Sequence, residues 1–115
     1  MSNWVLFAED DQLFAMLFMK HWMARFPKCE IVQASGLLES RHELKSREAL
    51  PLFAILDANL EDGLGQDLCP DLRCPYLLWT AGGTDCLQAK PQGRAALELC
   101  LEEIGSSLRG DLSLE

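Results

Sequence analysis

The sequence predicts a single α/β domain built on a doubly wound parallel sheet. The apolar segments 4–8, 52–57 and 76–79 lack polar alternation, which is typical of parallel strands covered on both faces. A further strand is expected at 30–34, and helical patterns lie between the strands at 12–26, about 37–49, 64–72 and 93–108. Alternating strands and helices at this spacing imply right-handed crossovers and therefore helices on both faces of the sheet.

Helix and strand breakers mark the ends of these elements. Pro27 ends the first helix, Pro51 precedes the strand at 52–57, and Pro75 starts the strand at 76–79. Gly63 and Gly65 mark the loop that leaves residue 57. A chain of 115 residues buries roughly two-thirds of its unfolded surface. We therefore expect one domain at 1–109, followed by a tail at 110–115.

Composition excludes several classes of function. The net charge of -8 argues against nucleic-acid binding, because phosphate recognition requires a basic surface. No segment has the length of a membrane span and the first residues do not form a signal peptide, so we expect a cytoplasmic protein that does not enter a membrane. Five cysteines, an odd number, favour reduced thiols over a disulfide framework or a zinc site.

Polar residues with complementary chemistry follow the apolar strands. Glu9 and Asp10 follow the first, Asp57 closes the third, Thr80 follows the fourth, and Lys90 comes ten residues later. In an open parallel sheet the ligand crevice lies outside the carboxyl ends of the strands, so these residues should converge. They are what a carboxylate needs to accept a phosphoryl group: acids for a cation, a hydroxyl donor and a fixed positive charge.

The expected roles follow from this chemistry. Asp57 is the candidate acceptor, Lys90 the candidate cationic contact and Thr80 the hydroxyl donor to a phosphoryl oxygen. Carboxylates and backbone oxygens are the ligands that Mg²⁺ uses in proteins. The predicted Mg²⁺ ligands are the carboxylates of Glu9, Asp10 and Asp57 and the backbone carbonyl of Asn59.

Four runs of the sequence, taken in order, resemble the receiver domain of two-component response regulators. They are the segments at 5–11, 55–63, 79–81 and 90–91, which contain the acid cluster, the candidate acceptor, a Thr-Ala pair and a Lys-Pro pair. The resemblance implies a flavodoxin-like fold, phosphorylation of Asp57 by a histidine kinase or phosphotransfer protein, and a bound Mg²⁺. It also implies that Thr80 and Lys90 read the phosphoryl group, that Ala81 leaves access to it, and that the protein is a signalling domain rather than an enzyme.

The chain departs from the family pattern in three places. Glu61 stands where the family usually has proline. Only nine residues separate Thr80 from Lys90, and they include Gly82 and Gly83, so we expect the fourth helix to be absent or reduced and the fifth strand to be a stub near 86–89. Leu87 replaces the aromatic residue that moves with the Thr in many receivers. No effector domain follows, so we expect a stand-alone receiver with unusual output.

The first helix carries more apolar residues than one face can bury. One interpretation is that a second apolar stripe binds a kinase or phosphotransfer helix or forms a homodimer, since exposed methionines suit adaptable binding surfaces. The other interpretation is that the helix is buried more deeply than its pattern indicates. Helical spacing assigns Leu13, Phe14, Leu17, Phe18 and Trp22 to the core, and Ala15, Met16, Met19 and Met23 to the second stripe.

Two other classes of function remain open. A haloacid-dehalogenase-type phosphatase also uses an Asp at a strand end, but it requires an acid two residues later, where this chain has Asn59. A degenerate receiver would act as a binding or inhibitor module without phosphorylation. The shortened segment after Thr80 favours the degenerate receiver, whereas the presence of every expected site residue favours the signalling receiver.

Overall fold

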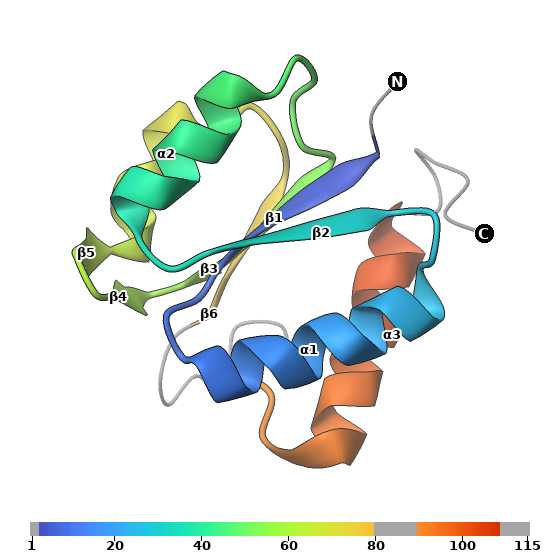
Figure 1. Ribbon diagram of the computed structural model, residues 1–115. Helices are drawn as coiled ribbons and strands as arrows, with labels where there is room; N and C mark the ends of the chain where they lie inside the picture. The colour runs from blue at the N-terminus through green and yellow to red at the C-terminus, as the bar shows by residue number, and fades with distance from the viewer. Residues whose placement is uncertain (1–2, 80–89, 109–115) are drawn as a thin grey trace.

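A computed structural model describes residues 3–79 and 90–108. Its main sheet has four strands: β1 (Trp4–Ala8), β2 (Glu30–Ala34), β3 (Phe53–Asp57) and β6 (Tyr76–Trp79). They run parallel in the order β2-β1-β3-β6, so β1 and β3 occupy the centre (Figure 1). This confirms the predicted α/β fold class and all four predicted strands.

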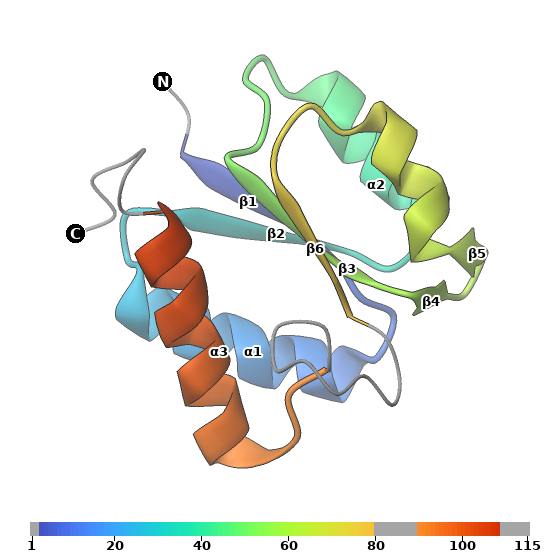
Figure 2. The same ribbon diagram turned by 180° about the vertical axis from the view of Figure 1, so that it is seen from behind.

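Helices cover both faces of the sheet. The helix α1 (Gln12–Arg25) and the helix α3 (Gly93–Leu108) lie on one face, and α2 (Leu37–Ser46) lies on the other with the 3₁₀-helix η1 (Gly65–Asp71), as the two opposite views show (Figures 1 and 2). The predicted helix at 37–49 therefore ends three residues early. The predicted helix at 64–72 is 3₁₀ rather than α, and Pro70 within it removes a backbone donor that an α-helix would use.

The alternation of side chains along the strands builds two hydrophobic layers. On one face, Val5, Phe7 and Ile55 pack with α1 and α3, whose buried residues include Phe18, Trp22, Leu97, Leu101 and Ile104. On the other face, Trp4, Leu6 and Leu56 pack with Leu37 of α2 and Leu68 of η1. The continuous apolar pattern of β1 and β3 thus reflects burial on both faces, as the sequence predicts.

The orientation of α1 differs from the prediction. Leu13 and Leu17, assigned to the core, are exposed by 82% and 46%, whereas Ala15, assigned to the second stripe, is buried. Met19 packs partly against the core, while Met16 and Met23 are exposed, as predicted. Apolar residues surround this helix, so periodicity could not select the buried face. The large rings of Phe18 and Trp22 determine the buried face, and Ala15 shares that face because it lies one turn before Phe18 and two turns before Trp22.

A short hairpin after β3 was not predicted. The strands β4 (Asn59–Leu60) and β5 (Gly63–Leu64) pair antiparallel around the Glu61–Asp62 turn. Strands of two residues are too short to give a sequence pattern. The predictions for the fifth strand near 86–89, the fourth helix, Leu87 and the tail at 110–115 lie outside the described residues.

Two negative predictions can be compared with the described part of the chain. No helix there is long and apolar enough to cross a membrane. Cys29, Cys69 and Cys74 are not joined in disulfides among the residues described. Burial raises the pKa of both Cys29 and Cys74 to about 11, and near Cys29 the charge of Glu30 adds to this effect, so these two thiols stay protonated at neutral pH.

Candidate functional site

The register of the two central strands brings the acidic residues together. Ala8 of β1 pairs with Leu56 of β3, so the next residues along each strand, Glu9 and Asp57, lie side by side at the carboxyl end of the sheet. Carboxylate oxygens of Glu9, Asp10 and Asp57 all lie within 4.8 Å of one another. Three of the predicted cation ligands therefore converge, although they are separated by up to 48 positions in sequence.

Backbone hydrogen bonds fix the main chain at this edge. The N–H of Glu9 donates to the carbonyl of Ala34 at 2.9 Å, and the side-chain amide of Gln33 donates to the carbonyl of Glu9 at 2.8 Å. On the other strand, the N–H of Asn59 donates to Asp57 Oδ1 at 3.3 Å. The turns that carry the acids are thus held by their own strands and by β2.

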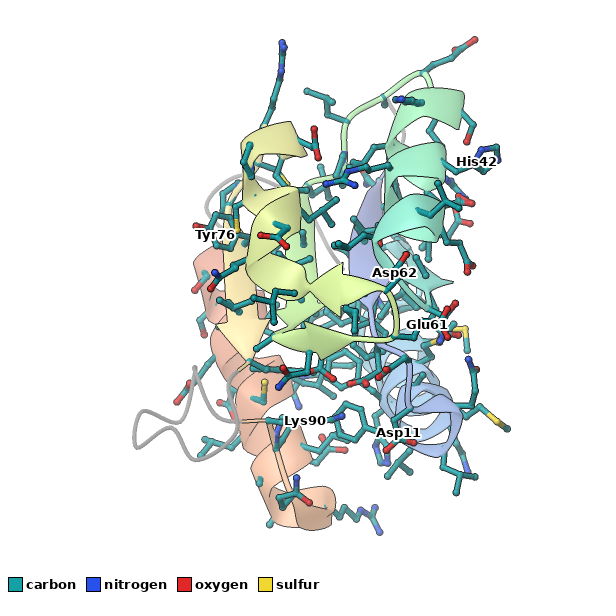
Figure 3. All side chains as sticks on the ribbon, turned by 90° about the vertical axis from the view of Figure 1, so that its left-hand side faces the viewer. Asp11, His42, Glu61, Asp62, Tyr76 and Lys90 are labelled. Atoms are coloured by element: carbon teal, nitrogen blue, oxygen red, sulfur yellow. The ribbon has the colours of Figure 1, made fainter. Side chains whose placement is uncertain are left out.

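Lys90 enters the site from the segment just before α3. Its Nζ lies 2.8 Å from Glu9 Oε1 and 3.6 Å from Asp57 Oδ2, in ion-pair contacts rather than well-directed hydrogen bonds. The same Nζ lies 4.4 Å from the centroid of the Phe14 ring, in a cation–π contact. In Figure 3 the Lys90 side chain extends toward the start of α1, where Asp11 is labelled.

The pKa values of Glu9 and Lys90 are both raised, but for different reasons. Burial raises the pKa of Glu9 to about 7, although Lys90 and the N–H of Asp11 oppose the rise and the charge of Asp57 adds to it. Burial alone would lower the pKa of Lys90, but the carboxylates of Glu9 and Asp57 outweigh it and the net shift is upward. Lys90 therefore stays charged at neutral pH, while Glu9 is close to half-protonated.

The donor set of the cluster fits a hard divalent cation. All three converging groups are carboxylates, which suit Mg²⁺ or Mn²⁺ and not a thiolate-bound metal. Three carboxylates face one ammonium group, so a divalent charge would neutralise the site when Glu9 is ionised. Burial is the main cause of the raised pKa of Glu9, and the neighbouring charge of Asp57 adds to it.

Three further residues shape the site without having been assigned to it by sequence. Phe14 lies beneath Lys90. Asp11 caps α1 by accepting the N–H of Phe14, which fixes the start of that helix beside the acids. At Gly65 a Cβ atom would collide with the carbonyl of Asp57, so only glycine allows η1 to pass this close.

The outcome for the predicted site residues is mixed. Glu9, Asp10, Asp57 and Lys90 converge as predicted. Asn59 lies two residues after Asp57 with an exposed side chain, and its role as a carbonyl ligand stays a prediction. Thr80 and Ala81 lie outside the described residues.

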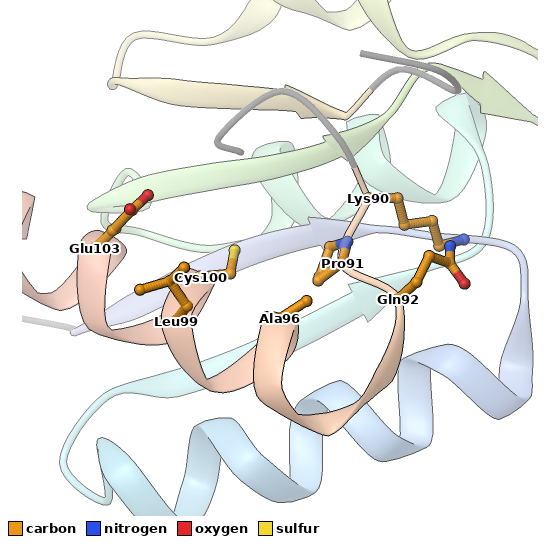
Figure 4. A pocket seen from close by; sticks show the side chains of 7 residues that line it. All are labelled: Lys90, Pro91, Gln92, Ala96, Leu99, Cys100 and Glu103. Atoms are coloured by element: carbon orange, nitrogen blue, oxygen red, sulfur yellow. The ribbon is translucent and has the colours of Figure 1, made fainter. Parts of the chain in front are cut away.

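A cavity of about 250 Å³ adjoins the site on its α3 side. Lys90, Pro91 and Gln92 line one end of it, and Ala96, Leu99, Cys100 and Glu103 of α3 line the rest (Figure 4). Its lining is mostly apolar. Lys90 is the residue that both lines this cavity and contacts the acids of the site.

The comparisons with known proteins show the fold. No model of a protein family matches the chain, and no curated protein matches it. Among solved structures, a two-component response regulator from Clostridium difficile superposes with a TM-score of 0.73 at 20% identity, over 96% of this chain and all of the other. The Mn²⁺-bound form of response regulator Rcp1 superposes with a TM-score of 0.73 at 18% identity, over 98% of this chain and 99% of the other.

A third structure extends the comparison to a phosphorylated protein. The phosphorylated cyanobacterial phytochrome response regulator RcpA superposes with a TM-score of 0.68 at 18% identity, over 100% of this chain and 97% of the other. Nearly the whole length of each protein is covered, so the likeness is not confined to one motif. The chain has the CheY-like, flavodoxin-type fold of response-regulator receiver domains.

Proposed function

We propose that this chain is a response-regulator receiver domain that accepts a phosphoryl group on Asp57. The observation that carries the proposal is the convergence of Glu9, Asp10, Asp57 and Lys90 at the carboxyl edge of a receiver-type sheet. Asp57 keeps 16% of its side chain exposed there, whereas Glu9 is fully buried. Asp57 is therefore more accessible to an incoming donor than Glu9.

The chemistry is the transfer of a phosphoryl group between two nucleophiles. A carboxylate oxygen of Asp57 attacks phosphorus, the bond from phosphorus to the donor nitrogen or oxygen breaks, and an acyl phosphate forms. Lys90 already lies 3.6 Å from Asp57 and would contact the new phosphoryl oxygens. Thr80 is proposed to donate its hydroxyl, and Ala81 to leave access. Later hydrolysis of the acyl phosphate resets the domain, so we classify it as a signalling domain and not as an enzyme.

The cation in this proposal is Mg²⁺, held by the carboxylates of Glu9, Asp10 and Asp57 and by the carbonyl of Asn59. Two findings support a divalent ion: the three carboxylates lie within 4.8 Å, and a structure with the same fold is a Mn²⁺-bound form. When bound, the ion neutralises the phosphoryl oxygens. Glu9 must lose its proton to act as a ligand, which couples cation binding to pH.

The phosphoryl donor is proposed to be a cytoplasmic histidine kinase or histidine phosphotransfer protein that contacts α1. Four exposed apolar side chains lie on this helix, which begins beside the acidic site: Leu13, Met16, Leu17 and Met23. This set replaces the predicted one, because Met19 packs partly against the core. Exposed methionine and leucine on a helix suit contact with another helix. The same surface could instead pair two copies of the chain.

One observation favours the degenerate alternative. Lys90 lies closer to Glu9 than to Asp57, at 2.8 Å against 3.6 Å, so it already neutralises an acid of the site. A receiver that no longer accepts phosphate would keep such an ion pair as a structural link between β1 and α3. The two alternatives differ in whether Asp57 can be phosphorylated.

Intact-mass spectrometry after incubation with acetyl phosphate and Mg²⁺ tests the proposal. We expect a gain of one phosphoryl group that is lost at alkaline pH, absent without Mg²⁺ and absent from Asp57→Asn. Asp67→Asn is the matched control, because Asp67 is an exposed acid ten residues away on η1. Failure to label the folded wild-type protein under conditions that label an ordinary receiver would favour the degenerate module.

A further inference from the structure

A second cavity lies away from the acidic site, at the opposite end of the sheet. It has a volume of about 360 Å³. The last two turns of α2, the segment before β3 and the segment after η1 form its walls, so it opens near the start of β3, whereas Asp57 closes the end of that strand. Its lining consists of Arg41, Leu44, Lys45, Leu50, Asp71 and Arg73.

The charge of this cavity is opposite to that of the molecule. Three of its six lining residues are cations and one is an acid, in a chain with net charge -8. Arg41 is already neutralised, because its Nε lies 2.9 Å from Asp71 Oδ2 and its Nη2 donates to the carbonyl of Asp67 at 3.3 Å. Lys45 and Arg73 are exposed and have no ion pair with any described residue. Two positive charges are therefore available to a ligand.

An apolar surface lies between the charges. Leu50 is exposed by 53%, and Leu44 packs against the core layer beneath the cavity. The dipole of α2 favours a cation such as Lys45 in the last turn, but Arg73 lies outside any helix, two residues beyond the end of η1. An exposed leucine beside two cations without acidic partners matches the anatomy of a small binding site, with an apolar contact and a charged rim.

We propose that this cavity binds an acidic peptide segment of a partner protein, in which an apolar side chain stands between carboxylates. Charge complementarity supports this occupant, because Lys45 and Arg73 can each pair with a carboxylate while Leu50 contacts the apolar residue. A nucleic acid is disfavoured, since its phosphates would meet the surrounding negative charge. Because the cavity and Asp57 lie at opposite ends of β3, the segment can bind whether or not Asp57 is phosphorylated.

A labelled peptide tests the proposal directly. The probe is a fluorescein-tagged hexapeptide of alternating glutamate and leucine, and its binding to the full chain is followed by fluorescence anisotropy and by amide NMR shifts. We expect saturable binding that weakens as salt is added, with the largest shifts at 41–50 and 71–73. The double variant Lys45→Glu, Arg73→Glu should bind at least ten-fold more weakly, and Leu50→Ser several-fold more weakly.

Matched controls separate this site from general attraction. The double variant Lys20→Glu, Lys28→Glu changes net charge by the same amount at exposed lysines outside the cavity, and it should bind like the wild type. The proposal would be overturned if this control lost as much affinity for the peptide as the cavity variant does. It would also be overturned if a glutamine-leucine peptide bound as tightly as the glutamate-leucine peptide. Saturable binding of inorganic phosphate at the same residues without peptide binding would likewise overturn the proposal, since it would make the cavity a small-anion site. NMR spectra of each variant confirm that it is folded.

Discussion

At the scale of single residues, Glu9 is unusual among the described residues because it is an acid buried beside other acids. Its side chain is fully buried, yet it is surrounded by two other acids and balanced by one lysine. A carboxylate in such a place is retained at a cost in folding free energy unless a ligand uses it. At this position the proposed function requires a carboxylate, whereas the stability of the fold disfavours one.

The pH dependence of stability follows from the raised pKa of Glu9. The folded protein holds this proton up to about pH 7, whereas the unfolded chain releases it near 4.5, so stability falls as pH rises through that window. Relative to Glu9→Gln, the free energy of unfolding of the wild type without cation should fall by up to about 3 kcal/mol between pH 5 and pH 8. Urea denaturation in the presence of a metal chelator measures this free energy of unfolding. Glu48→Gln, at an exposed acid, should follow the wild type. If the free energy of unfolding depended on pH in the same way for the wild type and Glu9→Gln, the raised pKa of Glu9 would be refuted.

The sequence predicted the acids of the site but not its supporting residues. Glu9, Asp10 and Asp57 could be predicted because strand ends in a parallel sheet share one edge, which is a property of topology. Phe14 could not be assigned to Lys90, because that contact depends on which face α1 buries. Gly65 is required by a collision with the carbonyl of Asp57, and sequence shows no such distance.

At the scale of elements, the hairpin after β3 is connected to α2. The carboxylate of Asp62 accepts the N–H groups of Leu37 at 2.6 Å and Leu38 at 3.0 Å, so the turn from β4 to β5 caps a helix 25 residues earlier. Gly36 allows this approach, because a Cβ there would collide with the carboxylate. Hydrogen bonds from Leu38 and Leu37 lower the pKa of Asp62. The contribution of Asp62 to the stability of the fold is therefore fully present above the usual pKa of an aspartate. It is lost as the pH falls through the lowered pKa of Asp62.

Removing this cap should loosen the start of α2. We expect Asp62→Ala to lower the Tm by about 5 °C, since an N-cap loss at this chain length has an effect of that size. The amide protons of Leu37 and Leu38 should exchange faster, which NMR hydrogen exchange measures directly. Asp62→Asn, which keeps one acceptor oxygen, should have a Tm between those of the wild type and Asp62→Ala. Asp67→Ala is the matched control, and unchanged exchange at both leucines in Asp62→Ala would exclude the capping role.

The exposed side of α1 gives the prediction for partner contact. Met16→Asp should lower the rate of phosphoryl transfer from a histidine phosphotransfer protein at least ten-fold, because the charge would be buried in the contact. Labelling by acetyl phosphate should be unchanged, since that donor needs no docking surface. Leu38→Asp, at a leucine that is 78% exposed on α2, is the matched control. Equal rates of phosphoryl transfer to Met16→Asp and to the wild type would exclude α1 as the docking surface. Analytical sedimentation shows separately whether the same change dissociates a dimer.

The elements themselves were predicted more fully than their orientation. Strand and helix positions follow from apolar runs and from the breakers Pro27, Pro51 and Pro75, which act locally. Which side of α1 faces the sheet depends on packing of Phe7, Phe18 and Trp79, whose ring centroids lie 4.9–6.0 Å apart. That cluster joins three separate elements, and no local pattern in α1 specifies it.

At the scale of the whole molecule, a cation site at the edge of the central strands should report on global stability. The acids belong to β1 and β3, the strands at the centre of the sheet, and Lys90 connects them to α3. A ligand that binds only when these parts are assembled stabilises the folded state by mass action, by about 2.7 kcal/mol at one hundred times its Kd. The whole domain, and not only the site, should therefore respond to Mg²⁺.

We expect Mg²⁺ to raise the Tm by several degrees at pH 8 and by less at pH 6, because protonated Glu9 cannot serve as a ligand. The fluorescence of Trp79 should change with the same midpoint, since its ring lies 5.7 Å from Phe14, which contacts Lys90. Calorimetry and a fluorescence titration measure the two effects. Glu9→Gln should lose both, whereas Glu48→Gln should keep both. A Tm rise of equal size in Glu9→Gln would mean that Mg²⁺ stabilises the protein through its general negative charge, and the acids at the ends of β1 and β3 would then have no special affinity for a cation.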